Sequence, residues 1–254
     1  MKRLSILSVL LVLFTSIWAV EKLPLLNIPY NISKTIKLPY SAHSTTTVFQ
    51  DHQGMIWIGS YHGIIRYDGY NTTFYLTENS MRTKECAVMS IAQIDNQHLI
   101  VGSLGGISYF NITNGKADPL PSALKQIKSV RTLYLLDGTL WIGTDGNGVW
   151  KYNLRTEKIK HLSNPSIKLS SIYALCPVGN RMYVGALEGL TVIDMKKDKM
   201  TSIPLPYKNK FVNSLLWNSQ EKKLLIGMEG ELSVYSPQNQ AIETCNLLKG
   251  NVFK

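Results

Sequence analysis

The sequence is poor in the residues that most often carry enzyme chemistry. It has three cysteines and five histidines in 254 residues, with no C-x-x-C pair and no histidines at a spacing that suits a metal site. It also lacks G-x-S-x-G, H-E-x-x-H and a glycine-rich phosphate loop. We therefore expect no metal, no cofactor and no catalytic residue, and we predict that the chain is not an enzyme. Cys86, Cys176 and Cys245 are widely separated, which favours buried free thiols over a disulfide framework.

Charged residues are also few, at 17% of the chain, and their formal net charge is +10. Two of these positive charges, Lys2 and Arg3, belong to an N-terminal leader, so +10 less 2 leaves +8 for the rest. The other basic residues are scattered through turns, without a basic helix or a stripe interleaved with stacking aromatics. This distribution argues against a nucleic-acid partner. It permits a mild preference for acidic ligands or an anionic surface.

Residues 1–19 have the pattern of a secretory signal peptide. Lys2 and Arg3 precede an apolar run over residues 4–18, which is too short to span a bilayer comfortably. Cleavage after Ala19 is expected, although Ile17 suits the cleavage motif poorly and leaves an uncleaved anchor as an alternative. We therefore predict that the chain is exported.

The most informative feature that the sequence does contain is a repeat. The stretch LWIGTDGNGVWKY over residues 140–152 recurs closely at 56–67 and 99–110 and more weakly at 182–193 and 224–235. The anchoring glycines are 43, 41, 42 and 42 residues apart; they are Gly59, Gly102, Gly143, Gly185 and Gly227. A period in the forties built from short strands is typical of propeller blades.

Each unit contains four candidate strands separated by turn residues. They are expected at 46–50, 55–60, 64–68 and 72–76 in the first unit, and at 130–135, 139–144, 149–153 and 158–162 in the third. No segment shows a sustained helical period. We predict an all-β chain, a β-propeller of four-stranded blades with about five blades present. Its expected parts are a signal peptide (1–19), a lead-in with one strand (20–43) and propeller repeats (44–254), divided into 44–77, 86–118, 128–162, 169–205 and 210–247.

The repeated residues have expected physical roles. The glycines lie where a neighbouring blade must approach closely. Trp57, Trp141 and Tyr183, two residues before their glycines, point to one strand face and should fill the gap between adjacent sheets. They could instead stack on sugar, but their register with the core pattern favours packing. The same role is expected of the residues eight or nine positions after the glycines, namely Tyr67, Phe110, Tyr152, Ile193 and Tyr235.

The repeat resembles a known one. The pattern apolar-x-x-apolar-x-x-D-x-x-G-x-[LI]-W-I-G-[TS]-x-x-G-[LI]-x-x-[YF], here around Asp51, Gly54, Trp57 and Gly59, is similar to the two-component regulator propeller repeat. The resemblance covers about residues 44–250. It is strong in the first and third units and weaker elsewhere, with Tyr183 and Leu225 in place of tryptophan in the fourth and fifth units. It implies the periplasmic sensor region of a hybrid two-component regulator from a gut Bacteroides-type bacterium. In that family an inner-membrane anchor, a kinase and a DNA-binding domain lie in regions not present here.

The number of blades in the complete ring is left open by the sequence. Residues 31–38 and about 241–247 are two candidates for one outer-strand position. We favour a truncated chain that belongs to a propeller of seven or more blades, and a self-contained five-bladed ring is the alternative. Membrane contact is then expected only through missing C-terminal parts or an uncleaved leader.

The candidate ligand site lies on the face that carries the second-to-third turns and the longer links between blades. Aromatic, amide and carboxylate groups around a central opening suit a hydroxyl-rich ligand such as an oligosaccharide. Solvated turn residues without a role are the alternative for each position. The candidates are Tyr61, His62, Asp145, Asn147, Glu188 and Glu229.

The function predicted from these features is that of a ligand-sensing module. It would bind an oligosaccharide, or pair with a second copy as a homodimer through the propeller, and bias a conformational equilibrium. Two alternatives from other classes remain, a propeller-fold polysaccharide lyase or glycosidase and an envelope scaffold that binds proteins.

Overall fold

The structure is a computed structural model that describes residues 38, 44–76 and 87–244. The predicted signal peptide, most of the lead-in strand at 31–38, Cys86 and Cys245 lie outside the described residues. Within them the chain is all-β, with twenty strands in five separate four-stranded antiparallel sheets. One short 3₁₀ helix, Ser122–Gln126, lies between the second and third sheets.

The five sheets are formed by consecutive strands and are numbered here in chain order. Sheet 1 contains β1 (Thr45–Gln50), β2 (Ile56–Ser60), β3 (Gly63–Tyr67) and β4 (Thr72–Leu76). Sheet 2 contains β5 (Val88–Gln93), β6 (His98–Ser103), β7 (Gly106–Asn111) and β8 (Lys116–Asp118). Sheet 3 contains β9 (Val130–Leu136), β10 (Thr139–Thr144), β11 (Val149–Asn153) and β12 (Ile159–Leu162). Sheet 4 contains β13 (Ile172–Val178), β14 (Arg181–Ala186), β15 (Gly189–Asp194) and β16 (Lys199–Ile203). Sheet 5 contains β17 (Val212–Asn218), β18 (Lys223–Met228), β19 (Glu231–Ser236) and β20 (Ala241–Thr244).

These strands agree closely with those expected from the sequence. The strands predicted at 72–76, 139–144 and 149–153 have the observed bounds, and the other five predicted in the first and third units differ by one residue at one or both ends. Alternating apolar residues and turn dipeptides act locally, so the sequence determines these positions well.

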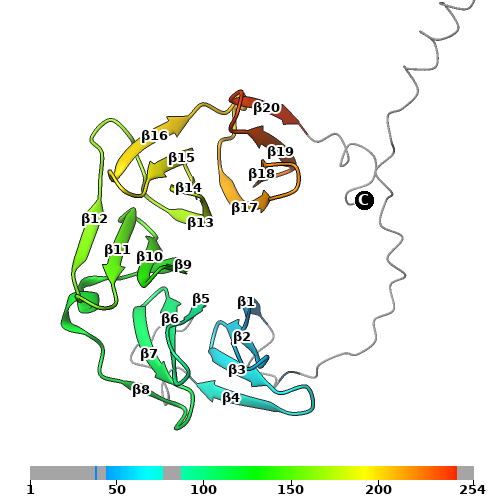
Figure 1. Cartoon of the computed structure of the whole chain (residues 1–254). Coiled ribbons are helices and arrows are strands. Elements are labelled where there is room, and N and C mark those ends of the chain that lie inside the picture. Colours follow the sequence, from blue (N-terminus) through cyan, green and yellow to red (C-terminus); the bar gives the residue numbers. More distant parts are fainter. Residues whose placement is uncertain (1–37, 39–43, 77–86, 245–254) are drawn as a thin grey trace, which may run out of the picture. The chain divides into compact units, whose positions relative to one another are not determined.

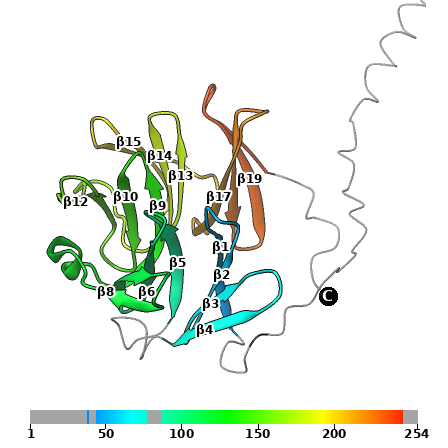
Figure 2. The same ribbon diagram turned by 60° about the horizontal axis from the view of Figure 1, so that its bottom comes forward.

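Each sheet packs against the next one along the chain. The first strands β1, β5, β9, β13 and β17 contact one another in that order and lie innermost, with the fourth strands outermost (Figures 1 and 2). Because the strands alternate in direction, the second-to-third turns share one face with the links between sheets. We call this the link face, and the opposite face, which carries the other turns, the turn face. Two backbone hydrogen bonds join a second-to-third turn to a link on this face. Leu104 N–H donates to Ala87 O (3.1 Å), and Leu187 N–H donates to Ser171 O (3.0 Å).

The repeated glycines are where the next sheet comes closest, which confirms their expected role. A β-carbon on Gly59, Gly102, Gly143 or Gly185 would lie 2.6–2.9 Å from a methyl group in the first residue of the next sheet. That residue is always β-branched and buried; the four are Val88, Val130, Ile172 and Val212. A side chain at the glycine would therefore force neighbouring sheets apart.

The aromatic residues two positions earlier are core residues. Trp57, Trp141 and Tyr183 are 0%, 2% and 1% exposed, which confirms packing and leaves their rings no surface for a sugar. Trp57 packs edge-on against Phe110 of the next sheet, at 5.8 Å between ring centroids. Its indole Nε1–H also donates to the buried Asp51 carboxylate at 2.8 Å, which gives the aspartate of the motif a structural role.

The second set of repeated apolar residues is also largely buried. Phe110, Tyr152, Ile193 and Tyr235 are core residues, while Tyr67 is half-buried and donates its hydroxyl to Gly69 O at 2.7 Å. Cys176 is a buried free thiol, as predicted. Burial raises the pKa of that thiol.

Candidate ligand-binding rim

Every innermost strand has a β-bulge at the same place, one residue after its start. Pairing with the second strand skips one residue in each sheet; the skipped residues are Thr46, Met89, Arg131, Tyr173 and Asn213. A bulge leaves the extra residue out of the ladder and redirects its side chain. The bulges therefore place five side chains of varied chemistry beside the link face, where the inner strands begin.

The bulge residue of sheet 3, Arg131, is held by a carboxylate of the β10–β11 turn. Its Nη2 lies 2.6 Å from Oδ2 of Asp145, and the two side chains are 22% and 31% exposed. The other carboxylate oxygen, Oδ1, accepts the hydroxyl of Ser171 in the link to sheet 4, at 2.5 Å. The Arg131 guanidinium beside it, with help from Ser171, holds the pKa of Asp145 below its ordinary value.

Aromatic rings continue this arrangement across sheets 4 and 5. The Arg131 guanidinium carbon lies 4.5 Å from the centre of the Tyr173 ring, a cation–π distance. Tyr173 in turn meets Phe211, just before β17, edge-on at 4.5 Å and 65°. All three side chains belong to half-buried residues. We call Arg131, Asp145, Ser171, Tyr173 and Phe211 the inner rim.

The link between sheets 3 and 4 connects the rim to a second carboxylate. Ser170 accepts the backbone N–H groups of Gly146 and Gly148 at its carbonyl, at 3.0 and 3.1 Å. Its own N–H (3.2 Å) and hydroxyl donate to Glu188 in the β14–β15 turn. Two consecutive serines thus bring Asp145 and Glu188 to the same link.

The other predicted site residues lie elsewhere on the link face. The Asn147 carbonyl accepts Trp150 Nε1–H and faces His161 Nε2, both at 3.1 Å. Trp150 and His161 lie on β11 and β12, away from the inner strand of sheet 3. Glu229 is exposed in sheet 5 and accepts Asn209 Nδ2–H at 3.2 Å. Tyr61 and His62 are exposed in the β2–β3 turn of sheet 1. The structure therefore brings together two of the six candidates, Asp145 and Glu188.

Sequence reasoning missed Arg131, Tyr173 and Phe211. A usable signal was present for Arg131 and Tyr173, because each bulge residue follows the first residue of its inner strand, as in Val130-Arg131 and Ile172-Tyr173. A polar or aromatic residue directly after that buried position is a candidate for the rim. The prediction instead selected acidic residues of the second-to-third turns, and these side chains form hydrogen bonds to the links between sheets.

The inner rim offers two aromatic edges, a fixed guanidinium and hydroxyl groups. Such a combination can stack on and hydrogen-bond to a hydroxyl-rich molecule. Among residues 38, 44–76 and 87–244, no group of three or more histidine, cysteine or acidic side chains could hold a metal ion. In that same part of the chain, no helix is long and apolar enough to cross a bilayer.

Comparison with solved structures relates this chain to the extracellular domains of hybrid two-component systems. Two structures of the BT4673 extracellular domain from B. thetaiotaomicron, one assigned to a proposed one-component and the other to a proposed hybrid two-component system, are 31% identical to it. Each has a TM-score of 0.75 and aligns with 83% of this chain, which spans 29% of the BT4673 domain. The extracellular domain of BT3049 from the same organism, a proposed hybrid two-component system, shares the fold at 16% identity. Its TM-score is 0.55, and the match covers 87% of this chain and 42% of the BT3049 domain.

No protein-family model and no curated protein matches the sequence. The structural comparison nevertheless confirms the resemblance seen in the repeat: the structures similar to this chain are extracellular domains of proposed hybrid two-component systems.

Proposed function

We propose that this chain is part of the periplasmic sensor of a hybrid two-component signalling protein and that its five sheets are blades of a β-propeller. The observation that carries the proposal is the 31% identity to the BT4673 extracellular domain over 83% of this chain. The packing of consecutive sheets through glycine and a β-branched residue supports the assignment of blades. A ring of seven or more blades, with further blades outside this chain, remains our expectation.

The proposed ligand is an oligosaccharide that binds at the inner rim. Support comes from Tyr173 and Phe211, whose half-buried rings meet at the start of neighbouring inner strands. Arg131 and Ser171 lie beside them with their polar groups already oriented by Asp145. Preorganised groups lose less conformational freedom when they bind.

The proposed role is binding without catalysis. Binding at the rim would favour one arrangement of neighbouring blades and so shift an equilibrium that the signalling protein reads. Asp145 and Glu188 support this view, because both carboxylates are hydrogen-bonded to consecutive serines. Pairing of two copies through the propeller remains a further part of the proposal.

Thermal unfolding against a panel of neutral and acidic oligosaccharides tests the proposal. A ligand that binds only the folded state must raise the midpoint. We expect one glycan class to do so for the wild-type chain, and the Tyr173→Ala variant to lose most of the shift. Tyr134→Ala is the matched control, because Tyr134 is an exposed tyrosine on the neighbouring inner strand β9. No shift with any glycan, or an equal loss in both variants, would contradict binding at the rim.

A further inference from the structure

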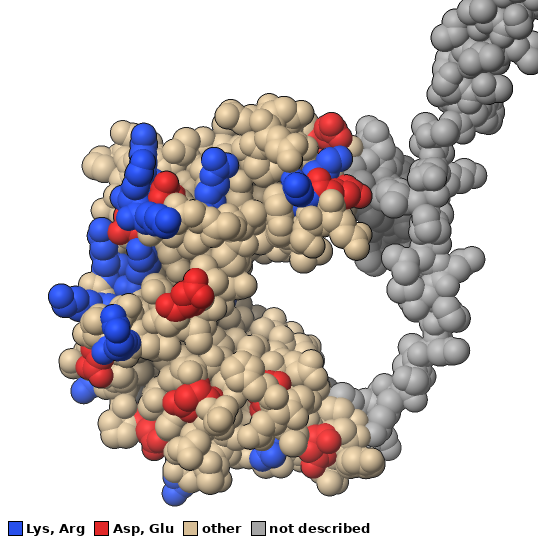
Figure 3. Space-filling model, in the orientation of Figure 1, with Lys and Arg blue, Asp and Glu red and all other residues tan. Residues whose placement is uncertain are grey.

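Basic side chains gather over sheets 3 and 4 in the view of Figure 3, at its upper left. The exposed residues in the turns and outer strands of these two sheets include Lys158, Lys160, Lys196, Lys197 and Lys199. Some of the basic side chains in this region are paired with a carboxylate and others are not. The difference appears on the turn face when the contact between sheets 3 and 4 is compared with the contact between sheets 4 and 5.

Between sheets 3 and 4, one carboxylate neutralises two lysines. Asp198, in the turn before β16, receives Lys151 Nζ at 2.5 Å on one oxygen and Lys160 Nζ at 2.7 Å on the other. Its backbone is in the left-handed region, with φ of 54°. Lys151 also lies 5.1 Å from the centre of the Trp141 ring. Lys151 and Lys160 of sheet 3 are thus both paired with one acid from sheet 4.

Between sheets 4 and 5, the equivalent acid is missing. The residue directly before β20, with the matching φ of 58°, is Gln240. It has the place of Asp198 but carries no charge. The sheet 4 residues in register with Lys151 and Lys160 are the uncharged Val192 and Thr201, and the cations of sheet 4 lie at other positions.

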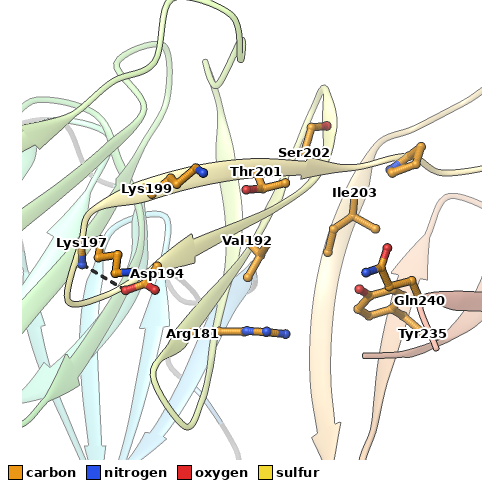
Figure 4. A pocket seen from close by; sticks show the side chains of 11 residues that line it. Arg181, Val192, Asp194, Lys197, Lys199, Thr201, Ser202, Ile203, Tyr235 and Gln240 are labelled. Atoms are coloured by element: carbon orange, nitrogen blue, oxygen red, sulfur yellow. Dashed lines mark hydrogen bonds between the residues drawn. The ribbon is translucent and has the colours of Figure 1, made fainter. Parts of the chain in front are cut away.

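A pocket fills the space beside Gln240. It has a volume of about 460 Å³ and is bounded on the sheet 4 side by Arg181, Lys197 and Lys199, with Tyr235 and Gln240 on the other. In Figure 4, Arg181 extends toward the wall that Tyr235 and Gln240 form. Thr201 and Ser202 add hydroxyl groups along β16.

The pocket is lined by one carboxylate, that of Asp194, which accepts hydrogen bonds from the turn that follows it. Asp194 lies opposite Arg181 and Lys199 in the strand register, so it shares their side of the sheet. Its Oδ1 accepts the N–H groups of Lys196 and Lys197 and the Asn180 amide, each at 3.0 Å. The backbone N–H of Lys197 contributes most to lowering the pKa of this carboxylate. Three cations and one anion leave the pocket a formal charge of 3 − 1 = +2.

We propose that this pocket between sheets 4 and 5 binds the anionic group of an acidic saccharide, a carboxylate or a sulfate ester. The anion lies in the pocket beside Gln240 and accepts hydrogen bonds from Arg181 and Lys199. Thr201, Ser202 and the Gln240 amide then face the sugar hydroxyls. The saccharide part rests on the proposed sensor function, whereas the anion site rests on the charges of the pocket.

Isothermal titration of the purified chain at constant ionic strength tests the proposal with three probes: inorganic sulfate, tri-galacturonate and neutral galactotriose. The decisive variant is Gln240→Glu, which has nearly the same shape but supplies the missing carboxylate from within the chain. Lys158→Gln is the control, because it removes one charge from the same basic surface outside the pocket. A charge-assisted hydrogen bond contributes enough that we expect Gln240→Glu to weaken binding of tri-galacturonate and sulfate by about tenfold or more. Lys158→Gln should change it less than about twofold.

The outcomes separate the parts of the proposal. Tri-galacturonate binding that Gln240→Glu abolishes and Lys158→Gln preserves supports the site. Equal binding by wild type and Gln240→Glu, or an equal loss in both variants, overturns it in favour of a diffuse basic surface. Sulfate binding without tri-galacturonate binding overturns the saccharide part. Binding of galactotriose that Gln240→Glu leaves unchanged belongs to the inner rim, so the proposed function can succeed where this site fails.

Discussion

Gly143 and Ile172 approach each other more closely than any other residue type at position 143 would allow. A β-carbon there would lie 2.7 Å from Cγ2 of Ile172 in the next sheet and 2.5 Å from Cγ2 of Thr132 in its own. Both neighbours are β-branched, and such side chains are restricted about χ1. The distance between sheets 3 and 4 is therefore set by a bare backbone on one side and a stiff side chain on the other.

Gly143→Ala should lower the free energy of unfolding by about 1–3 kcal/mol, because the added methyl overpacks this contact. Urea unfolding followed by tryptophan fluorescence measures the change. Thr132→Ser removes the closer methyl. The double variant should therefore lose less free energy of unfolding than the sum of the losses in the two single variants. Simple additivity, or an unaltered midpoint in Gly143→Ala, would mean that the sheets separate without cost.

Trp57 and Asp51 provide a second test, this time of a buried hydrogen bond. Trp57→Phe keeps most of the apolar ring but leaves Asp51 Oδ2 without the indole donor. A buried acceptor that loses its partner costs about 1–3 kcal/mol. Trp141→Phe is the comparison, since Trp141 is as deeply buried but contacts Lys151 through its ring face. We expect chemical denaturation to show the larger loss for Trp57→Phe, and an equal loss would assign both effects to ring size alone.

The ion pair between Asp145 and Arg131 should make stability depend on pH. Arg131 and Ser171 hold the pKa of Asp145 below its ordinary value of 3.8. A carboxyl with a depressed pKa in the folded state contributes its stability above the unfolded value, and this contribution is lost as the pH falls through the folded value. The loss should therefore appear below about pH 4.

Comparison of Asp145→Asn with wild type isolates this contribution. The variant should be less stable by about 1 kcal/mol at pH 7, a value reduced for partial exposure. The difference should shrink as the pH is lowered from 5 to 2.5. The exposed turn residue Asp137 gives the control substitution, Asp137→Asn. A gap between wild type and Asp145→Asn that stays constant over this range would show that the ion pair does not stabilise the fold.

The strands and the contacts between sheets could be predicted from the sequence because their signals are local and recur. Gly143 and Trp141 are two residues apart, and their places in β10 follow from strand alternation alone. The close approach of Ile172 then follows from the need to omit a side chain. One local role was less visible: the aspartate of the D-x-x-G turn, Asp51, serves the buried indole of Trp57 as well as its own turn.

The candidate site could be predicted only in part, because its contacts join distant segments. Arg131 reaches the rim through a bulge in the pairing of β9 with β10, and its partner lies 14 positions away, so its place after Val130 marks the position but not the contact. Its partner Asp145 was found because acidic turn residues are conspicuous. Asp198 pairs with two lysines 47 and 38 positions away, a contact that we call the clasp. That Gln240 has the matching place becomes visible only when the turns of neighbouring sheets are compared.

Asp198→Asn tests whether that clasp holds sheets 3 and 4 together. Burial acts to raise the pKa of Asp198, but Lys151 and Lys160 outweigh it and hold the carboxyl below its ordinary value. The amide would leave two lysines without their shared anion, at an expected cost of about 2 kcal/mol in the free energy of unfolding. Sulfate added at constant ionic strength should restore more stability to this variant than to wild type, because it can replace the lost charge. Lys158→Gln, which also changes the charge of sheet 3, should show neither effect. An Asp198→Asn variant as stable as wild type, with no added response to sulfate, would mean that the two lysines are satisfied by solvent and that the clasp contributes nothing.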